Sequence, residues 1–162
     1  MFKSMDVPSS RTTDLLWQPR IIISIYLLSA ILLLAAGCDQ QGQAVDLYVD
    51  AVMLMELNEN ELAIQKLNSA VKLNRRFSLA YSLLGDIYQK LKEYEKAASA
   101  YEKATELNPF SFKDYFNLGR VYQLMEKFAL AIKAYSKACE LDPNHLEAHI
   151  NVAKCYYEIK DY

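Results

Sequence analysis

The sequence has little glycine, little proline, few cysteines and no excess of either charge. Its 162 residues include 4 Gly, 4 Pro and 3 Cys, and 18 Lys and Arg are balanced by 20 Asp and Glu. Because 52% of the residues are hydrophobic, a disordered or collagen-like chain is excluded. The balanced charge excludes a strongly basic nucleic-acid-binding domain, and three cysteines are too few for a disulfide-rich miniprotein. The length fits about one folded domain.

Catalytic and metal-binding motifs are also missing. The sequence has no glycine-rich phosphate loop, no G-x-S-x-G and no H-E-x-x-H. His145 and His149 have the spacing of a metal-binding pair, but they fall at a turn and at a packing position, and no third ligand has a suitable spacing. A disulfide between Cys139 and Cys155 is conceivable, although buried free thiols are the commoner outcome for lone helical cysteines. We therefore expect no enzyme activity, no metal and no cofactor.

The N-terminal 37 residues differ in composition from the rest. The segment from Ile21 to Gly37 carries no charge, and Arg20 precedes it directly. As a helix it would be about 25 Å long, at the short limit for crossing a bilayer. A basic region followed by an apolar stretch and small residues is typical of a signal peptide. We expect residues 1–37 to be a signal peptide or membrane anchor, and residues 38–43 to be a polar tether.

The end of this segment, Leu34-Ala35-Ala36-Gly37-Cys38, resembles the lipobox of bacterial lipoproteins. The resemblance implies that Cys38 is lipidated and that the chain is cleaved before it. One position departs from the pattern, because Ala35 stands where leucine is usual. An uncleaved transmembrane anchor and ordinary secretion are the alternatives. Each of the three predicts an exported protein, and the first two predict one held at the membrane of a bacterial cell envelope, on its periplasmic or other extracytoplasmic side.

The remaining residues repeat with a period of 34. One unit contains small and aromatic residues at fixed spacing, and adding 34 to each number finds the same residue types again. The first set is Tyr81, Leu84, Gly85, Tyr88, Ala97, Tyr101, Ala104, Leu107 and Pro109, and the second is Tyr115, Leu118, Gly119, Tyr122, Ala131, Tyr135, Ala138, Leu141 and Pro143.

This pattern resembles the tetratricopeptide repeat, a helix–turn–helix unit that stacks into an all-α solenoid. The resemblance implies units at 44–77, 78–111 and 112–145 and a partial unit at 146–162. Turns are expected at 58–60, 92–93 and 126–127, and helices should end before Pro109 and Pro143. The family's mid-helix glycines imply a close helix crossing, with Ala63, Ala97 and Ala131 as the facing small residues. The tyrosines are expected to pack, with their hydroxyls reaching an edge or a partner.

The two terminal units differ from the central ones. In the first, Asp50 replaces a leucine and Arg75 replaces the proline, which we interpret as the polar end of the solenoid. In the last, the first helix would have no second helix to cover it, and Ile150, Val152 and Tyr156 would be partly uncovered. This feature favours a fragment of a longer array, and self-association through the uncovered helix is a further hypothesis.

In this family the first helices of the units line a concave groove that binds peptides. Here the resemblance implies a groove of mixed apolar and charged character, suited to a protein or peptide partner rather than to nucleic acid. The residues required by the chaperone-binding carboxylate clamp of the family are not at the matching positions. The candidate groove residues are Tyr48, Val52, Ser82, Asp86, Gln89, Lys113, Phe116, Arg120, Gln123 and Lys154, and the wider groove adds Val45, Met55, Glu56, Leu79, Lys90, Leu124, Glu147, Ile150 and Tyr157.

The leading hypothesis is a membrane-anchored, non-enzymatic adaptor or scaffold that binds a partner protein in this groove, for example in envelope or secretion-complex assembly. The alternative is the N-terminal scaffold of a longer enzyme, such as a glycosyltransferase or a protease.

Overall fold

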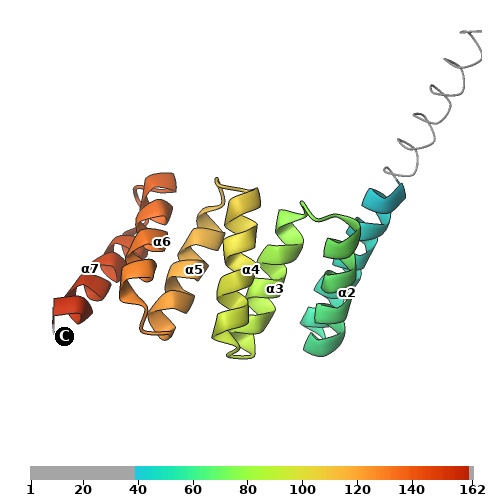
Figure 1. The fold of residues 1–162 in the computed structure, drawn as a ribbon, viewed down its shortest axis with the longest axis horizontal. Helices are drawn as coiled ribbons and strands as arrows, with labels where there is room; N and C mark the ends of the chain where they lie inside the picture. The colour runs from blue at the N-terminus through green and yellow to red at the C-terminus, as the bar shows by residue number, and fades with distance from the viewer. Residues whose placement is uncertain (1–38, 161–162) are drawn as a thin grey trace, which may run out of the picture. The chain divides into compact units, whose positions relative to one another are not determined.

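The computed structural model describes residues 39–160, and all regular secondary structure in this range is α-helical (Figure 1). Residues 39–56 are helical. They are followed by α2 (Asn60–Leu73), α3 (Ser78–Lys90), α4 (Tyr94–Leu107), α5 (Phe112–Leu124), α6 (Phe128–Leu141) and α7 (Leu146–Lys160). The starts of α2, α4 and α6 are 34 residues apart, and so are those of α3, α5 and α7. The predicted helical repeat is confirmed, and α4 and α6 end just before the two Asx-Pro pairs.

The N-terminal segment was predicted to contain a signal peptide or membrane anchor followed by a tether. The predicted signal or anchor segment and Cys38 lie outside the described residues. Residues 39–43 of the predicted tether are helical and belong to the helix that runs to residue 56. This stretch contains no proline to prevent a helix, and the next residue, Ala44, is fully buried. No helix within residues 39–160 is both long and apolar enough to cross a membrane.

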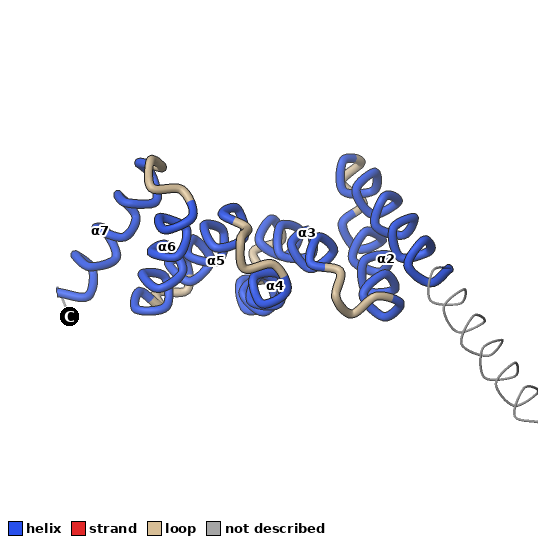
Figure 2. The backbone as a smooth tube through the Cα atoms, turned by 90° about the horizontal axis from the view of Figure 1, so that it is seen from above, coloured by secondary structure: helices blue, strands red, loops and turns tan. Residues whose placement is uncertain are grey.

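Helices that follow one another in the chain pack side by side through the array, as Figure 2 shows from above. Two hydrophobic clusters form the core. One joins the first two helix pairs around Leu67, Leu84 and Ile87, and the other joins α4, α5, α6 and α7 around Tyr101 and Tyr135. The packing of α2 on α3 is less extensive than that of α4 on α5. The junction between the first two repeats is therefore the more open of these two.

The mid-helix glycines lie at close helix crossings, as predicted, but the neighbouring side chain is an aromatic ring. A Cβ atom placed on Gly85 would lie 2.6 Å from Cε1 of Tyr101, and one on Gly119 would lie 2.7 Å from Cδ1 of Tyr135. Both tyrosines are fully buried. The alanines that we expected to face the glycines are also buried. The space that each missing side chain leaves is occupied by the tyrosine ring.

The turns inside the units share one unusual backbone conformation. Asn58, Lys92 and Glu126 have φ values of 63°, 61° and 58°, and they are spaced 34 residues apart. A left-handed residue other than glycine costs roughly 1–2 kcal/mol, less for asparagine. The left-handed residue reverses the chain within a few residues, so that consecutive helices can pack. This packing offsets the conformational cost.

Candidate functional site

The site is built on two fully buried tyrosines, whose hydroxyls bond to side chains of α3 and α5. The Tyr101 hydroxyl donates to Oδ1 of Asp86 at 2.6 Å and lies 3.2 Å from Oε1 of Gln89. In the next unit, the Tyr135 hydroxyl donates to Oε1 of Gln123 at 3.0 Å. The glycines make this geometry possible, because only a helix without a side chain at that point lets the ring pass beneath it. The predicted role of the tyrosine hydroxyls is confirmed at these two residues.

Asp86 is the centre of a polar network between α3 and α5. Its Oδ2 forms an ion pair with Nζ of Lys113 at 2.5 Å, and its Oδ1 accepts from Nδ2 of Asn117 at 3.3 Å. The Asp86 side chain is about a quarter exposed, at 26%. Three donors hold its position: Lys113 and Asn117 from α5 and the Tyr101 hydroxyl from α4. The Lys113 ammonium also neutralises its charge. The carboxylate is therefore a structural anchor of the groove.

The cationic side chains of Lys90 and Arg120 lie beside Asp86 and bond to neutral amide oxygens. Asp86, Gln89, Lys90 and Arg120 line a pocket of about 450 Å³. Nη2 of Arg120 donates to Gln89 at 3.1 Å and to Asn117 at 3.2 Å, and Nζ of Lys90 donates to Oδ1 of Asn58 at 2.7 Å. Within residues 39–160, neither cation has a carboxylate partner. This part of the groove consequently carries a net positive charge.

Ser82 was predicted to be a groove residue, but the structure buries it between α3 and α5. Its side chain donates from Oγ to Oδ1 of Asp114 at 2.5 Å, and Ser82 and Asp114 are only 6% and 4% exposed. Asp114 lies in the first turn of α5, where the helix dipole favours a negative charge, and its N–H donates to the side chain of the N-cap, Ser111. Ser82 thus contributes to the packing of α3 on α5 and not to the groove surface.

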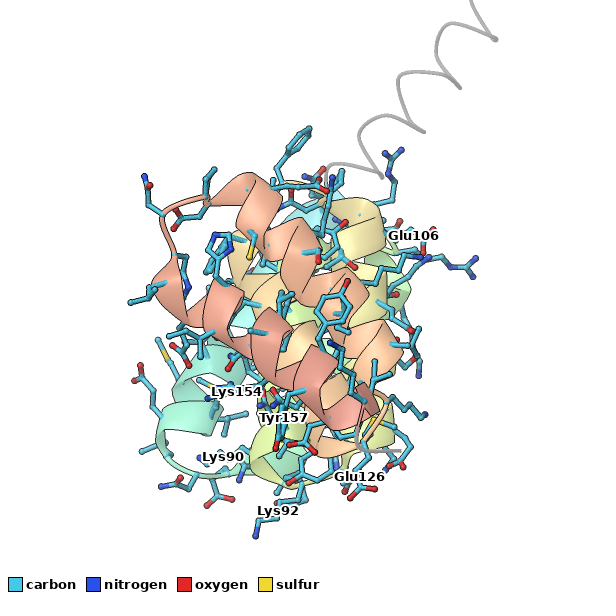
Figure 3. The ribbon with its side chains drawn as sticks, turned by 90° about the vertical axis from the view of Figure 1, so that its left-hand side faces the viewer. Lys90, Lys92, Glu106, Glu126, Lys154 and Tyr157 are labelled. Atoms are coloured by element: carbon cyan, nitrogen blue, oxygen red, sulfur yellow. The ribbon has the colours of Figure 1, made fainter. Side chains whose placement is uncertain are left out.

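The other predicted residues have three kinds of environment. Tyr48 and Val52 are half-buried against the first hydrophobic cluster, and Phe116 is packed against the second. Gln123 is held by Tyr135, as described above. Lys154 is exposed on α7, and Figure 3 shows it with Tyr157 and Lys90 on the same side of the view, whereas Glu106 lies at another edge.

Exposed apolar residues occur at several of the wider groove positions. They come from the helix over residues 39–56 and from α3, α5 and α7, so they extend along the array. Single exposed apolar residues need no explanation, and of these five only Val45 and Leu79 occupy equivalent positions of successive units. The five residues are Val45, Leu79, Leu124, Ile150 and Tyr157, which are 42–66% exposed.

Burial raises the pKa of both groove tyrosines. For Tyr101, desolvation is the largest cause, and the charge of Asp86 adds to it. For Tyr135, desolvation again dominates, and Arg120 opposes it. Both hydroxyls are protonated at neutral pH, as an ordinary tyrosine is, and they donate to Asp86 and Gln123.

His145 and Cys155 are used in packing, whereas His149, predicted to lie at a packing position, is exposed. The ring of His145 lies 4.5 Å from that of Phe112, and its Nδ1 accepts from the N–H of Ala148. Nε2 of His149 is 3.0 Å from the carbonyl of Pro143. Cys139 and Cys155 are free thiols, and burial raises the pKa of each. Among the described residues, no group of three or more His, Cys, Asp or Glu side chains could hold a metal ion.

Apolar residues of α7 are exposed, as predicted. Ile150 and Tyr156 are 42% and 54% exposed, and Val152 is half-buried. Ala153 is also exposed, although it occupies the position of the buried Gly85 and Gly119. At the other end, Asp50 is exposed and pairs with Lys66 at 2.7 Å, consistent with a polar terminal surface.

Sequence reasoning missed Asp114 and Asn117 as contributors to this region. The signal was present, because Ser111 and Asp114 have the S-x-x-D spacing of a helix N-cap. The burial of Asp114 could not be read from that spacing. The residues 34 positions away on either side are Ala80 and Ala148, so the carboxylate departs from the repeat, and its burial is explained by its contact with Ser82.

Comparison with known proteins supports the repeat assignment. The family model described as tetratricopeptide repeat matches residues 78–111 and 113–145. The fold is similar to a structure of the first TPR of Spaghetti (RPAP3) bound to the HSP90 peptide SRMEEVD, with a TM-score of 0.69 and 22% identity over 74% of this chain and 95% of that one.

Two further solved structures show the same architecture. A crystal structure of MamA has a TM-score of 0.67 and 27% identity over 71% of this chain and 67% of that one. The Arabidopsis OM64 TPR domain has a TM-score of 0.67 and 15% identity over 73% of this chain and 98% of that one. No curated protein matches the sequence significantly. Residues 78–111 and 113–145 are therefore tetratricopeptide repeats, and the flanking helices continue the same 34-residue arrangement.

Proposed function

We propose that this protein is a non-catalytic scaffold that binds a segment of a partner protein in the groove lined by α3, α5 and α7. The observation that carries the proposal is the arrangement of Arg120 and Lys90 beside the neutralised Asp86–Lys113 pair. Both cations are held in place by neutral amide oxygens, so they are oriented without being neutralised. Because the groove side chains are ordered before binding, the receptor loses little conformational entropy when the partner binds.

The chemistry of the groove indicates an acidic and apolar partner segment. A partner carboxylate can accept the free donors of the Arg120 fork. The exposed apolar residues on α3, α5 and α7 can hold alternate side chains of the same segment. The RPAP3 structure contains the acidic HSP90 peptide SRMEEVD, which supports an acidic ligand for this fold. The clamp positions of this chain differ, so we propose a different acidic sequence.

The test is a peptide selection followed by measured affinities. The full chain, in micelles of a neutral detergent, is presented with a phage-displayed library of random peptides. We expect the enriched peptides to contain Asp or Glu next to apolar residues. Fluorescence anisotropy of these peptides should give a dissociation constant that rises about tenfold or more in the Lys90→Gln/Arg120→Gln variant, because each lost charge-assisted hydrogen bond is worth roughly 1.5–3 kcal/mol.

The matched control is Lys133→Gln/Lys137→Gln, which removes the same charge from α6. Both lysines are away from this groove pocket, beside a cavity lined by α4, α5 and α6. Affinities within about twofold of the unmodified chain are expected for this control, because distant exposed charges are screened by salt. Equal losses in the two variants, or enriched peptides without acidic residues, would contradict the proposed site.

We also propose that the protein is exported and held at a membrane through Cys38, where it would act in envelope or secretion-complex assembly. The support is the sequence alone: an apolar segment after basic residues and a lipobox-like end. Mass spectrometry of the protein from a membrane fraction tests this proposal. We expect an N-terminal peptide that begins at Cys38 and carries diacylglycerol, whereas a chain that retains Met1–Gly37 would show an uncleaved segment instead.

A further inference from the structure

A further cavity lies where the end of α2 and the turn after it meet α3 and α4, away from the residues that line the groove pocket. It measures about 560 Å³ and is lined by Val71, Lys72, Arg75, Arg76, Tyr81, Lys103 and Leu107. Four of these seven residues are cationic and none is acidic. From this cavity we infer a binding site for a phosphate-bearing ligand.

The positive charge is specific to this junction. Lys72, Arg75 and Arg76 align with Glu106, Pro109 and Phe110 in the next unit, and with Glu140, Pro143 and Asn144 in the one after. The formal charge at these three positions is therefore +3 here and −1 at each of the other two junctions. Arg75, which the sequence analysis interpreted as an end effect, is part of a local set of cations.

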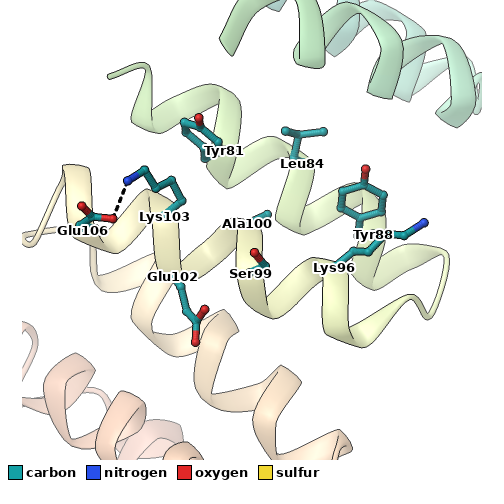
Figure 4. Close-up of a pocket in the computed structure, with 9 residues that line it drawn as sticks. All are labelled: Tyr81, Leu84, Tyr88, Lys96, Ser99, Ala100, Glu102, Lys103 and Glu106. Carbon is teal, nitrogen blue, oxygen red and sulfur yellow. Dashed lines mark hydrogen bonds and ion pairs between the residues drawn. The ribbon is translucent and has the colours of Figure 1, made fainter. Parts of the chain in front are cut away.

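These cations are available to a ligand. Lys72, Arg75 and Arg76 are exposed, and no ion pair engages them among the described residues. Lys103 is paired with Glu106 at 2.6 Å, and Figure 4 shows that pair beside Tyr81 at the ends of α3 and α4. Glu106 lines the neighbouring cavity rather than this one. The ion pair is surface-exposed, so it can open at little cost when an anion binds.

The side chains that line the cavity explain why phosphate is the best match. Consecutive arginines offer planar forks that bind phosphate oxygens in pairs, and lysines add compact charges. The ring of Tyr81 with Val71 and Leu107 makes an apolar wall that can contact the body to which the phosphate is attached. A phospholipid headgroup and a soluble phosphate compound both present this chemistry.

The experiment compares both sources on the full chain in neutral detergent micelles. Isothermal titration with inorganic phosphate and with pyrophosphate tests the soluble source. Thermal unfolding in micelles that contain phosphatidylglycerol, with phosphatidylcholine as the uncharged reference, tests the headgroup. We expect saturable binding or stabilisation by at least one anion, which weakens as salt is added. A stronger effect of phosphatidylglycerol would assign the site to a lipid, and a stronger effect of pyrophosphate would assign it to a soluble ligand.

The variant Lys72→Gln/Arg75→Gln/Arg76→Gln should weaken the anion effect about tenfold or more, since three charged hydrogen-bonding groups are lost. The control Lys92→Gln/Lys127→Gln/Lys160→Gln removes the same net charge from other exposed positions and should change it less than about twofold. Circular dichroism checks that both variants are folded. Equal weakening in the two variants, or no anion effect in the unmodified chain, would overturn the site. Failure here leaves the groove proposal standing, because none of these residues lines the groove pocket.

Discussion

The substitution Gly85→Ala should destabilise the protein by about 2–3 kcal/mol, because adding a methyl group to a filled core forces shifts of backbone and rings. The new Cβ would lie 2.6–2.8 Å from three atoms of the Tyr101 ring. That ring cannot move away easily, since it is fully buried and its hydroxyl is bonded to Asp86. Urea unfolding of the full chain in neutral detergent, followed by far-ultraviolet circular dichroism, measures the change in the free energy of unfolding.

The chain contains a matched control for this prediction. Gly42 lies in the helix over residues 39–56, and a Cβ there would meet nothing within 4 Å. Gly42→Ala should therefore raise stability by about 0.5–1 kcal/mol, the usual gain in a helix interior. A similar effect of the two alanines would show that the helix crossing at Gly85 is not tight.

The first unit supplies a compensating pair. Ala51 and Leu67 occupy the positions of Gly85 and Tyr101, and both are fully buried. The double variant Gly85→Ala/Tyr101→Leu should lose less stability than the sum of the single variants, because the smaller side chain makes room for the methyl group. Additive losses would mean that the methyl group and the ring do not compete for the same space.

The substitution Ser82→Ala should cost about 1–3 kcal/mol, because it removes a hydrogen bond from a buried charged group. The Asp114 carboxylate is 4% exposed, and the Ser82 hydroxyl donates to it at 2.5 Å. Chemical unfolding under the same conditions measures the loss. Ser99→Ala, on the exposed face of α4, is the control and should change stability by less than about 0.5 kcal/mol.

A second variant separates the unpaired carboxylate from the lost serine. Ala80 and Ala148 are fully buried at the positions equivalent to Asp114, so an alanine is tolerated in that environment. Ser82→Ala/Asp114→Ala should therefore recover most of the stability lost in Ser82→Ala, with a small remaining deficit from the helix dipole. If the double variant is less stable than the single one, the buried carboxylate has a favourable role that the Ser82 contact does not explain.

Much of the fold could be predicted from the sequence because the repeat is nearly free of insertions. Tyrosine, glycine, alanine and proline recur at a spacing of 34, and this periodicity predicts helix number, helix ends and packing faces. The exposed face of α7 followed from the same register. The helical conformation of residues 39–43 did not follow, because short polar segments are equally compatible with a helix or a tether until a neighbour buries the next residue, here Ala44.

The sequence by itself determined the repeat and the helical architecture, since both depend on local spacing. Only the tertiary structure decided that Ser82 is buried against Asp114, and that the hydroxyls of Tyr101 and Tyr135 bond to Asp86 and Gln123. It also brought Lys72 and Arg75 together with Lys103 at one cavity. Such contacts join residues of different helices, and they depend on the angle and depth at which the helices pack, which the 34-residue spacing does not specify.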